Sequence, residues 1–168
     1  MLLKKIEDAL NDQINAEFWS AYLYLSMSLH FQNVGRSGIA NWFMIQFQEE
    51  QAHALALIEY VNARDGKVVL QPIAEVPSSW DTIRDAFVAT LEHEKNVTAK
   101  INALYALAEE NKDFATRQKL NTFVAEQVEE EETVRQIIDD ITLVGEDGTG
   151  LLQIDRELGS RTFTAPTL

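Results

Sequence analysis

The sequence predicts an all-α protein: a four-helix bundle made of two antiparallel hairpins joined by a long crossover, with a short fifth helix at the C-terminal end. Apolar residues recur at helical spacing over four long stretches, and residues typical of turns separate these stretches. One of the three separating segments is much longer than the others. With 168 residues and 46% hydrophobic content, the chain can bury one sizeable core, so we expect a single domain over residues 1–168.

The first hairpin is predicted from residues 2–33 and 38–65, which both carry an apolar residue every three or four positions. Gly35 follows the first stretch and Gly66 follows the second, and glycine is the residue that most often ends a helix. Only a few residues connect the two stretches. They are therefore expected to pack as antiparallel neighbours.

The second hairpin is predicted from residues 79–111 and 113–144. Ser78, with Asp81 three residues later, has the spacing of a capping box and indicates where the third helix begins. A glycine-rich turn follows the fourth helix, and residues 150–159 have enough apolar character for a short fifth helix.

Residues 66–78 have the length that a crossover requires. At ~1.5 Å per residue, a second helix of about 28 residues is ~42 Å long. A linker of about 14 residues spans at most ~50 Å when extended. The linker can therefore return from the end of the second helix to the level where that helix began, which is one of the known arrangements of a four-helix bundle.

The composition favours cations as partners and excludes several classes of function. Lys and Arg number 14 against 27 Asp and Glu, a net charge of -13, which disfavours binding to nucleic acid and to anionic membranes. The absence of cysteine excludes disulfides, thiolate metal sites and cysteine nucleophiles. Charges among the first five residues and the lack of a long apolar run argue against a signal peptide or a membrane span. We expect a soluble, cytoplasmic protein.

Each long helix also places polar side chains where the apolar spacing predicts core. These residues are Glu17 in the first helix, Glu50 and His53 in the second, Glu94 in the third, and Gln127 and Glu130 in the fourth. All lie near the middle of their helices, so an antiparallel bundle brings them to one level. Burying four carboxylates together costs several kcal/mol per ion, and no Lys or Arg lies on these inward faces. A cation is therefore required.

The donor types suggest which cation. Carboxylate oxygens with one imidazole suit iron, manganese or zinc, and a set dominated by carboxylates favours two metals bridged by one carboxylate.

This pattern resembles the ferritins, and most closely the haem-free bacterial ferritins. The E-x-x-H motif of Glu50 and His53 carries the resemblance together with Glu17, Glu94 and the Gln127/Glu130 pair, and the likeness extends over essentially the whole chain. The resemblance implies that Glu17, Glu50 and His53 hold one iron of a ferroxidase centre. Glu50, as a bridge, would hold a second iron with Glu94 and Glu130, and Gln127 would lie beside the ligands rather than act as a strong one.

The second motif departs from that of related di-iron oxidases, which carry two E-x-x-H motifs. Here the second motif reads Gln127-Val128-Glu129-Glu130, so glutamine replaces a ligand and glutamate replaces the histidine. The second metal site is thus poorer in ligands than the first. A weaker, asymmetric pair releases oxidised iron more easily, so we hypothesise that iron passes through this centre as a substrate.

The resemblance implies roles for residues next to the iron pair. Glu49, Glu126 and Glu129, with Glu130, are placed where this subfamily has a third iron site. Tyr24 follows Glu17 by seven residues on the same face, where the family has a tyrosine that can supply an electron.

A haem is not expected, because bacterioferritins bind it through a methionine at the position that Gln51 occupies here. The resulting expectation is an iron-storage protein that oxidises Fe(II) with O2 or H2O2 and mineralises Fe(III) inside a hollow 24-subunit homo-oligomeric cage. Two alternatives are a di-iron redox enzyme or peroxide scavenger with a retained cluster, and a non-catalytic cage component like the light-chain ferritins. The ligand-poor second site argues against the first, and the full ligand set argues against the second.

Overall fold

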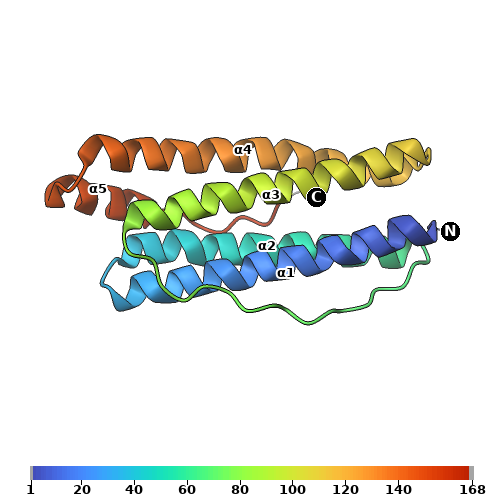
Figure 1. Ribbon diagram of the computed structural model, residues 1–168, viewed down its shortest axis with the longest axis horizontal. Coiled ribbons are helices and arrows are strands. Elements are labelled where there is room, and N and C mark those ends of the chain that lie inside the picture. Colours follow the sequence, from blue (N-terminus) through green and yellow to red (C-terminus); the bar gives the residue numbers. More distant parts are fainter. Residues whose placement is uncertain (1, 167–168) are drawn as a thin grey trace.

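A computed structural model describes residues 2–166, and within them the chain forms five helices and no strand (Figure 1). The helices are α1 (Lys4–Asn33), α2 (Ser37–Ala63), α3 (Ile83–Glu110), α4 (Phe114–Val144) and α5 (Gly148–Leu158). Helices α1 and α2 pair as one antiparallel hairpin, and α3 and α4 pair as the other. The predicted fold class is therefore confirmed. None of these helices is both long enough and apolar enough to cross a bilayer.

The crossover runs along α1 from one end of the bundle to the other (Figure 1). The side chain of Asn11 holds it at the first end, donating from Nδ2 to the carbonyl of Lys67 at 3.0 Å and accepting at Oδ1 from the amide of Val69 at 2.7 Å. At the other end, Ser26 Oγ donates to the carbonyl of Pro77 at 2.6 Å. These contacts satisfy backbone N–H and C=O groups of a segment that forms no helix or strand of its own.

Helices α1, α2 and α3 each end with a residue of positive φ. After α1 this residue is Gly35, with φ of 74°, as the glycine signal predicts. After α2 it is Asp65 rather than Gly66, and after α3 it is Lys112, with φ of 57° and 54°. Both carry a Cβ that disfavours this conformation.

Helix α3 begins four residues later than residue 79, and Thr82 caps it instead of Ser78. The hydroxyl of Thr82 accepts from the amide of Asp85 at 3.0 Å and donates to its carboxylate at 2.7 Å. Residues up to Trp80 belong to the crossover, where the Trp80 side chain packs against the apolar core. Two successive pairs with capping spacing, Ser78/Asp81 and Thr82/Asp85, exist in this stretch, and the second one forms the cap.

The core consists of two apolar clusters, one toward each end of the bundle. The first surrounds Phe31, Phe43 and Phe87, and the second surrounds Leu10, Leu57, Ile101, Leu120 and Phe123. Along every long helix, the residues of one cluster give way to those of the other near mid-length. The polar residues singled out in the sequence lie at this change.

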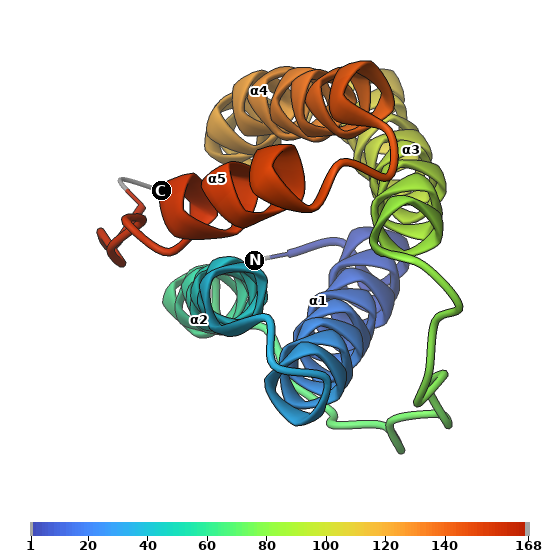
Figure 2. The same ribbon diagram turned by 90° about the vertical axis from the view of Figure 1, so that its left-hand side faces the viewer.

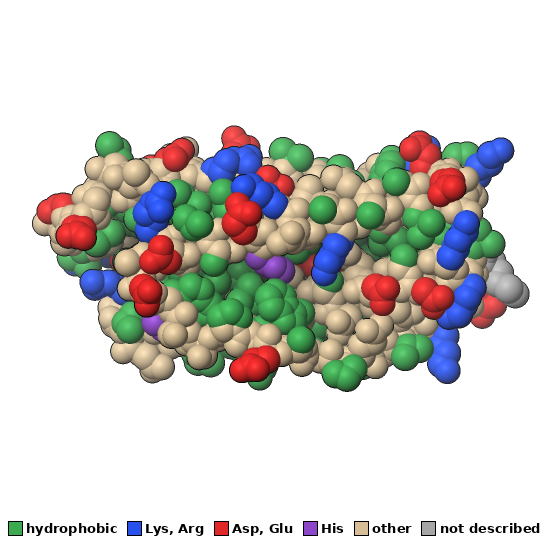
Figure 3. Space-filling view, in the orientation of Figure 1, with side chains coloured by type: hydrophobic (Ala, Val, Ile, Leu, Met, Phe, Trp, Pro, Cys, Tyr) green, Lys and Arg blue, Asp and Glu red, His purple; other side chains and the backbone are tan. Residues whose placement is uncertain are grey.

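Helix α5 crosses the end of the bundle on the side of α2 and α4 (Figure 2). Its Asp155 accepts from the amide of Ile39 at 2.9 Å. The contact needs glycine at position 38, because a Cβ there would lie 1.6 Å from the carbonyl oxygen of Asp155. After α5 the chain turns back along the bundle (Figure 1). On the face seen in Figure 3, acidic and basic side chains are interspersed, and apolar side chains gather between α1 and α3.

Candidate metal centre

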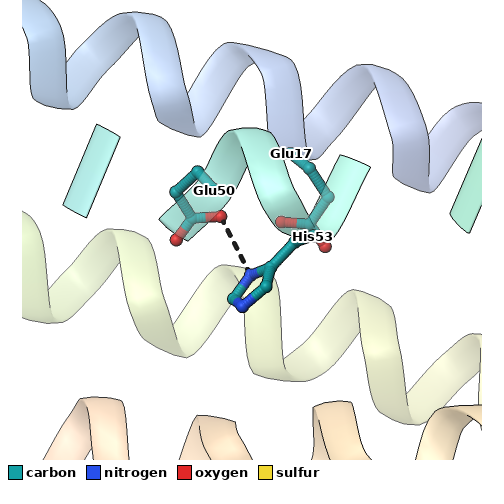
Figure 4. Close-up of side chains that lie close together, drawn as sticks. All are labelled: Glu17, Glu50 and His53. Atoms are coloured by element: carbon teal, nitrogen blue, oxygen red, sulfur yellow. Dashed lines mark ion pairs between the residues drawn. The ribbon is translucent and has the colours of Figure 1, made fainter. Parts of the chain in front are cut away.

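Three potential ligands meet at the middle of the α1/α2 hairpin. Glu17 comes from α1, and Glu50 and His53 lie one turn apart on α2 (Figure 4). One ligand atom from each lies within 4.8 Å of the others, and all three side chains are buried. His53 Nδ1 is 3.5 Å from Glu50 Oε2. Two carboxylates and an imidazole in this arrangement can share one metal ion.

The α3/α4 hairpin contributes the other side of the polar layer. Glu94 is fully buried, and its two oxygens accept hydrogen bonds from Tyr24 Oη and from Gln127 Nε2, the latter at 3.0 Å. Glu130 is partly buried and accepts at Oε2 from Gln46 Nε2 at 3.0 Å. Each of these carboxylates is therefore oriented by a neutral donor.

Burial shifts the acid–base equilibria of the inner residues. It raises the pKa of Glu17 to about 8, with the charge of Glu50 adding to the effect. It raises the pKa of Glu94 to about 7, with Glu130 adding to it, and also raises the pKa of Glu50. These carboxyl groups resist ionisation because burial removes the water that would stabilise their charged form.

The imidazole responds in the opposite way. Burial alone would lower the pKa of His53, but its close contacts with the carboxylates of Glu126 and Glu50 and the surrounding negative charge raise it well above its usual range. The layer thus gathers negative charge and draws a proton, or another cation, to its centre.

Several buried oxygens have no partner that suits them. Glu17 Oε2, Glu50 Oε2 and Glu126 Oε2 are buried and receive no well-aligned hydrogen bond from the described residues. An unsatisfied buried carboxylate oxygen is costly, and structures retain one where an ion or ligand completes it. Glu17 and Glu50 belong to the three-residue group around His53. The donor set and the free oxygens fit a divalent metal ion at that place.

A second group of carboxylates lies one turn outward, between α2 and α4. This outer acidic cluster consists of Glu49, Glu126, Glu129 and Glu130. His53 connects it to the inner residues, because its Nε2 is 3.2 Å from Glu126 Oε2. A cavity of about 400 Å³ opens onto the cluster, lined also by Thr133 and by Arg161, Thr164, Ala165 and Pro166 of the C-terminal segment.

The sequence-based site residues thus fall into three groups. Glu17, Glu50 and His53 converge closely enough for one ion. Glu94 and Gln127 are joined to each other and to Tyr24 by hydrogen bonds, while Glu130 is joined to α2 through Gln46. The third group lines the outer cavity, where Glu49 and Glu126 are partly buried and Glu129 is exposed.

Three residues of the site were missed by sequence reasoning. Gln13 Nε2 donates to Glu17 Oε1 at 2.7 Å, and Gln46 holds Glu130 as described. Each precedes an expected ligand of its own helix by four residues, so helical spacing could have found both. Arg161 reaches the outer cluster from beyond α5, and no periodic signal in the sequence points to it.

The chain matches the family described as ferritin-like domain over residues 7–144. It is 43% identical over 161 residues to a bacterial non-heme ferritin of Bacteroides fragilis, covering 96% of this chain and all of the relative. It is 34% identical over 163 residues to a bacterial non-heme ferritin of Staphylococcus aureus, covering 97% and 98%.

Solved structures show the same likeness. The open pore ferritin of the archaeon Archaeoglobus fulgidus superimposes with a TM-score of 0.95 at 46% identity, covering 96% of this chain and all of that one. A form of that protein engineered to be closed gives 0.96 at 46% identity, covering 98% and 100%.

Proposed function

The chain belongs to the ferritin-like family, and from that premise we propose that it stores iron by oxidising Fe(II) in its polar layer and keeping Fe(III) as a mineral. The observation that carries the proposal is the buried Glu17, Glu50 and His53 group, whose ligand atoms lie within 4.8 Å of one another and which keeps two carboxylate oxygens unsatisfied. A core this poor in compensating charge is stabilised by binding a cation.

The inner residues divide between two iron positions. Glu17, Glu50 and His53 hold the first Fe(II), and Glu50 bridges to a second Fe(II) held with Glu94 and Glu130. Each Fe(II) gives up one electron, so a pair reduces O2 to H2O2, or H2O2 to water, with two protons taken up. Tyr24 supplies a further electron in this proposal, and its hydrogen bond to Glu94 supports that role.

The second position is the weaker one. Gln127 presents its amide N–H to Glu94 and so orients a ligand instead of acting as one. Glu130 shares an oxygen with Gln46. Fe(III) leaves such a pair more readily than it leaves a symmetric cluster, which supports iron as a passing substrate. Glu49, Glu126 and Glu129, with Glu130, hold a third iron next to the pair.

Storage requires a shell, and we propose that residues 1–168 form one domain that assembles into a homo-oligomeric cage of 24 copies in the cytoplasm, without haem. Large apolar side chains on the surface support assembly. In the crossover, Val69, Leu70 and Ile73 are all exposed, and Leu70 is 70% exposed. Several exposed apolar residues in one segment are typical of a surface that another subunit covers.

Adding many equivalents of Fe(II) per subunit in air to the metal-free protein tests the proposal. Near-ultraviolet absorbance follows Fe(III), and sizing of the product identifies a mineral core. Rapid oxidation that ends in a large soluble particle supports storage. Oxidation that stops at about two irons per chain supports the alternative, a di-iron redox enzyme or peroxide scavenger with a retained cluster.

A further inference from the structure

Arg161 pairs with the outer acidic cluster from the segment that follows α5. Its Nη2 donates to Glu49 Oε2 at 2.6 Å, and its Nη1 donates to Oε1 of Gln46. The guanidinium also lies 5.0 Å from the centroid of the Trp42 ring. These three partners lie on one stripe of α2, at spacings of four and three residues, so a single helix face receives the arginine.

The backbone around Arg161 is fixed by contacts of its own. Asn41 Nδ2 donates to the carbonyl of Arg161 at 2.9 Å. Upstream, Asp155 and Gly38 dock α5 onto the start of α2. Downstream, residues 164–166 line the same cavity as the cluster. The docking of α5 and the contacts of the flanking residues therefore position Arg161 beside the outer acidic cluster.

The pair is well shielded from solvent for an ion pair near a surface. The Arg161 side chain is 26% exposed and that of Glu49 is 18% exposed. No other Lys or Arg among residues 2–166 forms an ion pair with the outer acidic cluster. Apart from the imidazole of His53, which contacts Glu126, Arg161 is thus the cation that the described residues supply to these four carboxylates.

We propose that Arg161 is a built-in counter-cation of the outer acidic cluster, and that a metal ion binds there through Glu49 only by displacing it. This inference rests on the proposed function, since it concerns the third iron position. Glu49 Oε2 already accepts from the guanidinium at 2.6 Å, and the positive charge of Arg161 repels a metal ion from the same carboxylate. Binding of metal to the cluster and docking of the C-terminal segment are then antagonistic, and each weakens the other to the same extent.

The displacement has a direct consequence for iron. While Arg161 is docked, Glu49 is turned toward it and the cluster carries one negative charge less. When a cation takes Glu49, the segment around residue 161 loses its charged contact with α2 and the cavity opens. The outer position therefore holds iron weakly, which suits a place where iron stops only briefly.

Calorimetric titration of the assembled, metal-free protein with Zn(II), a redox-inert probe, tests the inference. Arg161→Gln removes the competing charge, so we expect its third equivalent per chain to bind roughly tenfold more tightly than in the wild type. Arg156→Gln is the matched control, because Arg156 is an exposed arginine of α5 with no ion pair among the described residues. It should bind the third equivalent as the wild type does.

A second readout follows the displacement itself. With Trp19→Phe and Trp80→Phe, Trp42 is the only tryptophan, and Zn(II) should change its fluorescence at the third equivalent when Arg161 is present but not in the Arg161→Gln background. A purely structural arginine would give weaker, not tighter, metal binding when removed.

The outcomes separate the inference from its premise. If two equivalents bind in every variant but the third binds equally well with and without Arg161, the counter-cation role is wrong and the proposed function stands. If no variant binds the first two equivalents, the proposed function itself fails, and the inference falls with it.

Discussion

Replacing Glu17 with glutamine removes a buried ionisable group and keeps the shape of the side chain. Glu17 is fully buried, and burial with the charge of Glu50 raises its pKa from 4.5 to about 8. Between these values the folded, metal-free protein holds a proton that the unfolded chain has lost, so its stability falls as pH rises through this window. At pH 7, linkage at about 1.4 kcal/mol per pH unit makes this cost about 3 kcal/mol, as an upper bound.

Glu17→Gln should remove this cost, because the amide oxygen can still accept the hydrogen bond from Gln13. Guanidinium unfolding of the metal-free protein at several pH values measures the effect. We expect the variant and the wild type to be close below pH 4.5, and the variant to be increasingly more stable up to about pH 8. The control is Glu59→Gln, at an exposed position of α2, for which no such trend is expected. A variant that is less stable than the wild type at pH 8 would refute the reasoning.

Three further changes test other parts of the molecule. Changing Glu50 and His53 together to alanine should abolish rapid Fe(II) oxidation while circular dichroism shows the helices intact; unaltered oxidation kinetics would place the chemistry elsewhere. Lys112→Gly should raise stability by about 0.5–1 kcal/mol, seen as a higher denaturation midpoint, because glycine adopts the φ of 54° without strain. Asn11→Ala should lower stability by about 1–3 kcal/mol, since two hydrogen bonds to the crossover are lost; an unchanged midpoint would show that the crossover is held by other contacts.

The sequence predicted the bundle because the helical spacing and the linker length both constrain it. Four amphipathic stretches need a shared core, and a crossover as long as one helix permits only a few connections. Helix ends were predicted less well. Helix α3 is capped by Thr82 and not by Ser78, because two similar capping pairs follow one another there and the residues of the first belong to the crossover.

The inner site could be found from the sequence because each of its residues interrupts an apolar stripe. Glu17, Glu50 and Glu94 are conspicuous at positions where burial of a carboxylate is costly. Neutral amides such as Gln46 are not conspicuous in the sequence, because burying them costs less, although they determine which carboxylate oxygens remain free. The contact of Arg161 could not be predicted from the sequence for another reason. It depends on how α5 docks, and that docking depends on tertiary packing at Gly38 rather than on a local sequence pattern.

The hydrogen bonds within the polar layer also suggest an order in which the two irons bind. Glu17 has one oxygen held by Gln13 and one without a partner, and Glu50 also has an oxygen without a partner. A cation gains these oxygens without competing with a neutral hydrogen-bond donor.

Glu94 differs, because both of its oxygens already accept hydrogen bonds, from Tyr24 and from Gln127. A second cation has to share these oxygens with donors that already draw on their negative charge, which offsets part of its binding free energy. For the proposed two-iron centre we therefore predict that the first iron fills the position around His53 and that the second binds more weakly beside it. The asymmetry that the Gln127 motif predicts thus has a structural cause: what distinguishes the two positions is how many ligand oxygens the protein has already satisfied.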